Sequence, residues 1–136
     1  MGTGTDHLDR VTRLTVQSLA ARLEEAIALL SGPMVAAVPI EGVEDPHQEA
    51  CQTLRSIEIR LAEIASSDRT PGVVARALRG MRDGLASHLL TVQMLEHGGV
   101  ERHVARSVLV RGATRCHEAL QALLHTPNAT LVAQPV

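Results

Sequence analysis

Residues 88–103, HLLTVQMLEHGGVERH, combine three histidines and two glutamates around a double glycine. Imidazole and carboxylate groups can bind a metal ion or exchange protons with a substrate. Either chemistry requires several of these groups to converge on one point. The helices that would carry them therefore have to be placed first.

Four segments have apolar residues at helical spacing, over residues 6–30, 46–66, 71–97 and 100–125. Proline or glycine stands at their boundaries, as is typical of helix ends. We therefore expect an all-α fold, an antiparallel four-helix bundle, forming a single domain over residues 1–126. A flexible C-terminal tail is expected over residues 127–136, and a long apolar loop over residues 32–46 that caps the bundle end.

The apolar stripes predict which side chains form the core. The positions expected to face inward are Val16, Leu19, Ala20, Leu23, Ala26, Ile27 and Leu30, then Ala50, Leu54, Ile57, Leu61 and Ile64, then Val74, Leu78, Met81, Leu85, Leu89, Val92 and Leu95, and finally Val104, Val108, Leu109, Ala113, Cys116, Leu120 and Leu123. His88 lies on the third stripe, and we expect it to be half-buried and hydrogen-bonded.

The stretch 88–103 is interpreted as a hairpin between two helices. His97 in a last turn and Glu101 in a first turn suit the partial charges of helix ends, and a glycine pair permits a tight reversal. An antiparallel order also brings the start of the second helix to this end of the bundle. The alternative is therefore a metal site formed by His47, Cys51, His97 and His103. No paired ligand motif such as HExxH or CxxC is present, so we expect no metal and no other cofactor.

Small residues follow one another along the third helix at Ala77, Gly80, Gly84 and Ser87. A glycine inside a helix costs about 1 kcal/mol relative to alanine, so a compensating contact is expected. We expect close packing of the third helix against the fourth, near Gly112. The alternative is a groove that receives a partner helix.

Composition narrows the classes of protein. The 136 residues include no Phe, Tyr or Trp, and all 13 basic residues are Arg. This favours a high-GC bacterial genome, or alternatively a lysine-free protein delivered into a host cell. Stacking of nucleic-acid bases on aromatic side chains is excluded. The longest apolar run has eight residues, so we expect a cytoplasmic protein with no membrane segment.

Charge is unevenly divided along the chain. Residues 1–68 carry 5 Arg and 11 acidic residues, whereas residues 69–136 carry 8 Arg and 4 acidic residues. Like-charged pairs on the fourth helix call for a partner. Further apolar residues lie off the main stripes and suggest a homodimer surface. The interaction surface predicted in this way consists of Leu90, Met94, Val110, Arg102, Arg106, Arg111 and Arg115.

The sequence thus favours a non-enzymatic helical protein-interaction module of the adaptor, chaperone or effector type, which binds another protein or itself. No nucleophile–base motif can be placed on the helices. One alternative is a nucleic-acid or phosphate-binding regulator that uses the arginines of the third and fourth helices, although a net charge of −2 disfavours nucleic acid. A second alternative is a metal-binding helical bundle.

Overall fold

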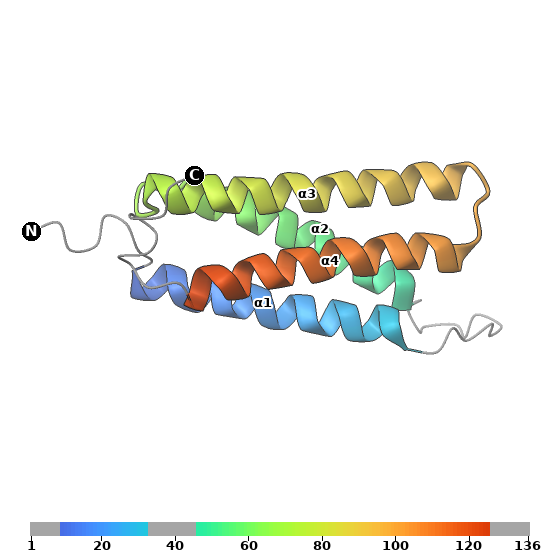
Figure 1. The fold of residues 1–136 in the computed structure, drawn as a ribbon, viewed down its shortest axis with the longest axis horizontal. Helices are drawn as coiled ribbons and strands as arrows, with labels where there is room; N and C mark the ends of the chain where they lie inside the picture. Colours follow the sequence, from blue (N-terminus) through green and yellow to red (C-terminus); the bar gives the residue numbers. More distant parts are fainter. Residues whose placement is uncertain (1–8, 33–45, 126–136) are drawn as a thin grey trace, which may run out of the picture.

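The computed structural model describes residues 9–32 and 46–125, which form four antiparallel helices (Figure 1). They are α1 (Arg10–Ser31), α2 (Pro46–Ala65), α3 (Gly72–His97) and α4 (Arg102–His125). No strand occurs in the described residues. The predicted all-α four-helix bundle is confirmed. The predicted cap over residues 32–46 and the predicted tail over residues 127–136 fall almost wholly outside the described residues.

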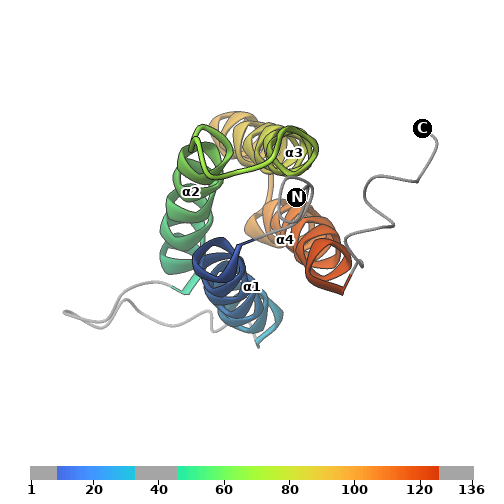
Figure 2. The same ribbon diagram turned by 90° about the vertical axis from the view of Figure 1, so that its left-hand side faces the viewer.

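The four helices occupy the corners of a square when the bundle is viewed end-on (Figure 2). Each helix packs against its two neighbours in chain order, and α4 closes the ring against α1. Short links between α2 and α3, and between α3 and α4, account for this order because they hold consecutive helices side by side. As a result, α1 and α3 lie at opposite corners.

The core consists almost entirely of the predicted stripes. Val16, Leu23, Leu54, Leu78 and Leu120 are among the fully buried side chains. The prediction is wrong at the start of α4, where Val104 is 38% exposed and Val108 is only partly buried. The neighbouring residues Ala105, Leu109 and Gly112 face inward there. At Gly112 on this face the α4 backbone lies directly against His88 of α3.

The helix ends differ in detail from the expected ones. Asp9 caps α1 by accepting a hydrogen bond of 2.6 Å from the backbone N–H of Thr12, so this helix begins later than residue 6. The Thr70 hydroxyl donates back to the Ile64 carbonyl at 2.7 Å, which completes the end of α2. In the α3–α4 turn only Gly99 has a positive φ, 78°, because Gly98 lies at −79°.

Two arginines tie α1 to α4 at both ends of the bundle. Arg106 of α4 donates to the carbonyls of Leu30, at 2.8 Å from Nε, and Gly32, at 2.6 Å from Nη2. Arg13 of α1 donates to the Leu124 carbonyl at 2.7 Å. The last carbonyls of a helix lack partners within the helix and carry partial negative charge. Each guanidinium therefore caps the C-terminus of the other, antiparallel helix.

Candidate functional site: the groove between α3 and α4

The histidines of residues 88–103 do not converge. His97 donates from Nδ1 to the Gln93 carbonyl at 3.0 Å, within its own helix. The Nδ1 of His103 lies 3.0 Å from the Oε2 of Glu101, two residues earlier in the chain. The Nε2 of His47, in α2, lies 3.4 Å from the Oε2 of Glu96. Within the described residues no group of three or more His, Cys, Asp or Glu side chains is arranged to hold a metal ion. The stretch is a hairpin in which His97 and His103 make local contacts, while Glu96 lies beside His47 of α2.

His88 of α3 lies directly against the backbone of Gly112 in α4. It is half-buried, as expected, and its Nδ1 donates to the Gly84 carbonyl at 2.8 Å. A Cβ added to Gly112 would lie 2.7 Å from both Cβ and Cγ of His88. The α4 backbone therefore packs directly on the base of this side chain, and only glycine fits at position 112.

The glycines of α3 behave differently. A Cβ added to Gly80 or Gly84 would meet nothing within 4 Å, and both residues are exposed. The expectation that this stripe packs closely against α4 is therefore wrong, because the close approach is confined to Gly112. Gly80 and Gly84 border open space instead.

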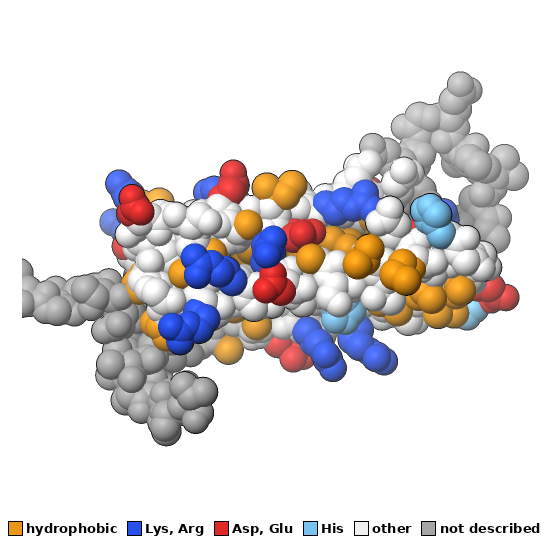
Figure 3. Space-filling view, turned by 90° about the horizontal axis from the view of Figure 1, so that it is seen from above, with side chains coloured by type: hydrophobic (Ala, Val, Ile, Leu, Met, Phe, Trp, Pro, Cys, Tyr) orange, Lys and Arg blue, Asp and Glu red, His pale blue; other side chains and the backbone are white. Residues whose placement is uncertain are grey.

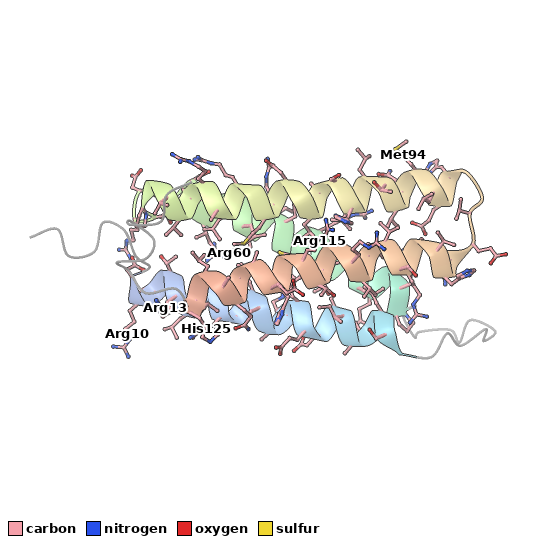
Figure 4. All side chains as sticks on the ribbon, in the orientation of Figure 1. Arg10, Arg13, Arg60, Met94, Arg115 and His125 are labelled. Atoms are coloured by element: carbon pink, nitrogen blue, oxygen red, sulfur yellow. The ribbon has the colours of Figure 1, made fainter. Side chains whose placement is uncertain are left out.

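The open space is a groove of about 540 Å³ between the N-terminal half of α3 and the C-terminal half of α4. Its apolar floor includes Met81, Leu85 and Leu123. Arg115 extends from α4 at the seam with α3 (Figure 4). The groove is lined by Ala77, Gly80, Met81, Gly84, Leu85, His88, Gly112, Arg115, Cys116, Ala119, Ala122 and Leu123.

The ionisable groups that line the groove give it a positive character. Arg115 carries a full positive charge and is the permanently charged side chain among the lining residues. Burial raises the pKa of the Cys116 thiol to about 11, so this group stays neutral near pH 7. No acidic side chain is among the lining residues. An apolar floor beneath a cationic edge favours an amphipathic ligand with a carboxylate.

The apolar residues of the predicted interaction surface are divided between two sides of the bundle. Leu90 and Met94 are 58% and 66% exposed. Met94 points away from the bundle (Figure 4), and hydrophobic side chains gather over this end of α3 (Figure 3). Val110 is half-buried, packs on the core and lines a separate hollow together with Leu30. Leu90, Met94 and Val110 therefore do not form one surface.

The four predicted arginines have different surroundings, although Arg106, Arg111 and Arg115 line one hollow together with Val110. Arg106 is engaged with the end of α1, so its guanidinium is committed within the chain. Arg102 lines a polar hollow of about 280 Å³ beside His47 and Glu96. Arg111 and Arg115 are exposed on α4. Of the four, only Arg115 lines the α3–α4 groove.

Nothing in the described helices has the length and apolar character needed to cross a membrane. No known protein family, curated protein or solved structure matches this chain. The class of molecule is thus defined by its fold, an antiparallel four-helix bundle with an open groove. The sequence signal for that groove was the pair of glycines at i and i+4, but spacing could not show on which side α4 would lie.

Proposed function

We propose that the protein is a helical interaction module that seats a helix of a protein partner in the α3–α4 groove. The observation that carries the proposal is the exposure of Gly80 and Gly84 inside a continuous helix. Each glycine costs about 1 kcal/mol of helix stability relative to alanine. Within the part of the chain that the structure describes, a Cβ added at either position would meet no atom within 4 Å.

A partner helix seated in the groove would use the space that the missing side chains of Gly80 and Gly84 leave. Small residues allow two helix backbones to approach closely and gain contact along their length. Ala77, Ala119 and Ala122 continue the low profile on both walls of the groove. Side chains this small would make few contacts with a flat protein surface. They suit a helix lying along the groove.

A protein partner is favoured over a nucleic acid. Arg106 is committed to the end of α1, and the chain has no aromatic side chain on which a base could stack. The floor of the groove is apolar, whereas nucleic-acid surfaces are contacted mainly through phosphates. The same floor favours the apolar face of an amphipathic helix.

The proposal is tested by placing a photo-crosslinking residue at position 84 in the full chain, expressed in the native host. We expect a crosslink to a helical segment of a protein, identified by mass spectrometry of the joined peptides. The matched control is position 72, another α3 glycine beside open space but outside the groove. Equal crosslinking at 72 and 84, or none at 84, would remove the proposal.

A further inference from the structure

The outer face of α1 carries a second unpartnered surface. Val11 and Leu14 are 59% and 58% exposed. They begin a row with alternating spacing of three and four residues, which places its members on one side of a helix. The row consists of six exposed residues, Val11, Leu14, Ser18, Ala21, Glu25 and Ala28. We call these six residues the outer face of α1.

This face is complementary to the groove in profile and in charge. Ser18, Ala21 and Ala28 are small, as are the glycines and alanines of the groove. Glu25 is the single charged residue of the face, whereas Arg115 is the permanent charge in the groove. The face spans roughly 26 Å and the groove wall from Ala77 to His88 roughly 16 Å, at 1.5 Å per residue. The face is therefore long enough to cover the groove with Glu25 near Arg115.

We infer that the groove of one copy receives the outer face of α1 of a second copy. The inference rests on the proposed function and names the occupant of that groove. A symmetric pairing of two grooves is disfavoured, because it would bring two Arg115 side chains together with no acidic lining residue between them. Pairing of the groove with α1 instead joins a cationic surface to one that carries a carboxylate.

The groove and the outer face of α1 are two different surfaces of the chain: α1 lies opposite α3 and beside α4 (Figure 2). The contact is therefore head-to-tail, and it generates a ring if the rotation closes or an open chain if it does not. Each copy added to an open chain leaves one unused groove and one unused α1 face at the ends. Assembly should then continue past the dimer as concentration rises.

The test uses two variants that each block one surface without touching the core. Gly84→Leu extends a side chain into the groove from a position where an added Cβ meets nothing within 4 Å. Ala21→Arg places a long cation on the exposed outer face of α1. The matched controls are Gly72→Leu in α3 and Gln52→Arg on the exposed side of α2. Circular dichroism and urea unfolding verify that every variant is folded.

Sedimentation of the unaltered chain should show an average mass that rises well above the 14.5 kDa of one copy as concentration increases. Each blocked variant alone should remain at one copy, while both controls assemble. A mixture of the two blocked variants should form a complex of two copies and stop there. The Ala21→Arg copy still has its groove, and the Gly84→Leu copy still has its α1 face.

Other outcomes overturn the inference. If Gly84→Leu prevents assembly and Ala21→Arg does not, two grooves pair symmetrically. If the unaltered chain stays at one copy up to millimolar concentration while position 84 crosslinks to another protein, the groove has a different occupant and the proposed function survives alone. A charge exchange adds a direct check. Glu25→Arg and Arg115→Glu should each weaken assembly at least several-fold, and the doubly substituted chain should recover it.

Discussion

The three interior glycines of α3 and α4 should respond in opposite directions to the same substitution. Gly80→Ala and Gly84→Ala should each stabilise the chain, because glycine in a helix interior is about 0.8–1 kcal/mol worse than alanine. The new methyl groups meet no atom within 4 Å, so nothing offsets this gain. The expected free energy of unfolding rises by about 1 kcal/mol for each substitution.

Gly112→Ala should destabilise the chain. The new Cβ would lie 2.7 Å from both Cβ and Cγ of His88, which is well inside van der Waals contact. Relieving such overpacking costs about 1–3 kcal/mol, and the gain in helix propensity of about 1 kcal/mol offsets only part of this. Removing the imidazole with His88→Ala should rescue the variant only partly, because the clash with the Cβ of residue 88 remains.

Urea unfolding followed by circular dichroism measures these differences as shifts in midpoint at constant slope. The measurement belongs at a concentration where the chain is a monomer, since self-association adds apparent stability that depends on concentration. A loss of stability in Gly84→Ala would contradict the geometry of the groove. A gain in Gly112→Ala would contradict the close contact between α4 and His88.

Three further outcomes test the ends of the bundle. Arg106→Ala should lower the free energy of unfolding by about 1–3 kcal/mol, because charge-assisted bonds to the end of α1 are lost; exposed Arg111→Ala, the matched control, should change it by less than about 0.5 kcal/mol. Gly99→Ala should lower the unfolding midpoint because its φ is 78°, whereas Gly98→Ala at −79° should change it little. The pKa of the Asp9 carboxyl is lowered, mainly by the hydrogen bond from the Thr12 backbone N–H. The stability that Asp9 contributes is therefore fully present above its unfolded-state pKa and is lost as the pH falls through its folded-state pKa. Asp9→Asn should therefore flatten the acid side of a stability profile measured between pH 2 and 5, and an unchanged profile would count against the cap.

The helices and most of the core could be predicted because both depend on local spacing. An apolar residue every three or four positions must face inward whatever the neighbouring helix is. The stripe fails most clearly at Val104, which is exposed while the smaller Ala105 beside it is buried; Ile27, Met81, Leu95 and Val108 are half-buried. A preference for large apolar residues cannot anticipate that choice, because close contact with another backbone rewards the small ones.

The roles of the arginines could not be predicted in the same way. Arg106 and Arg111 have the same side chain on the same helix, yet one caps the end of α1 and the other is exposed. The difference comes from the level along the bundle axis at which α1 ends. That level depends on how α1 and α4, which are distant in sequence, are aligned. The predicted interaction surface therefore combined Arg106, which stabilises the fold, with Arg111 and Arg115, which are exposed and accessible to a partner.

The groove is the place where rules of local structure and the observed fold disagree, and such disagreements concentrate at functional sites. Gly84 weakens its helix, and no contact among the described residues compensates for this loss. The stability of Gly84→Ala and the assembly of Gly84→Leu therefore have to be interpreted together. If Gly84→Ala raises stability while Gly84→Leu abolishes assembly, the glycine is retained for binding at the expense of folding, as is common when activity and stability compete. If Gly84→Ala raises stability and assembly tolerates leucine, the groove does not receive α1 of a second copy, and the crosslink at position 84 alone decides whether another protein occupies it. Without that crosslink, the exposed glycines would be a tolerated weakness of a bundle whose remaining helices hold it together.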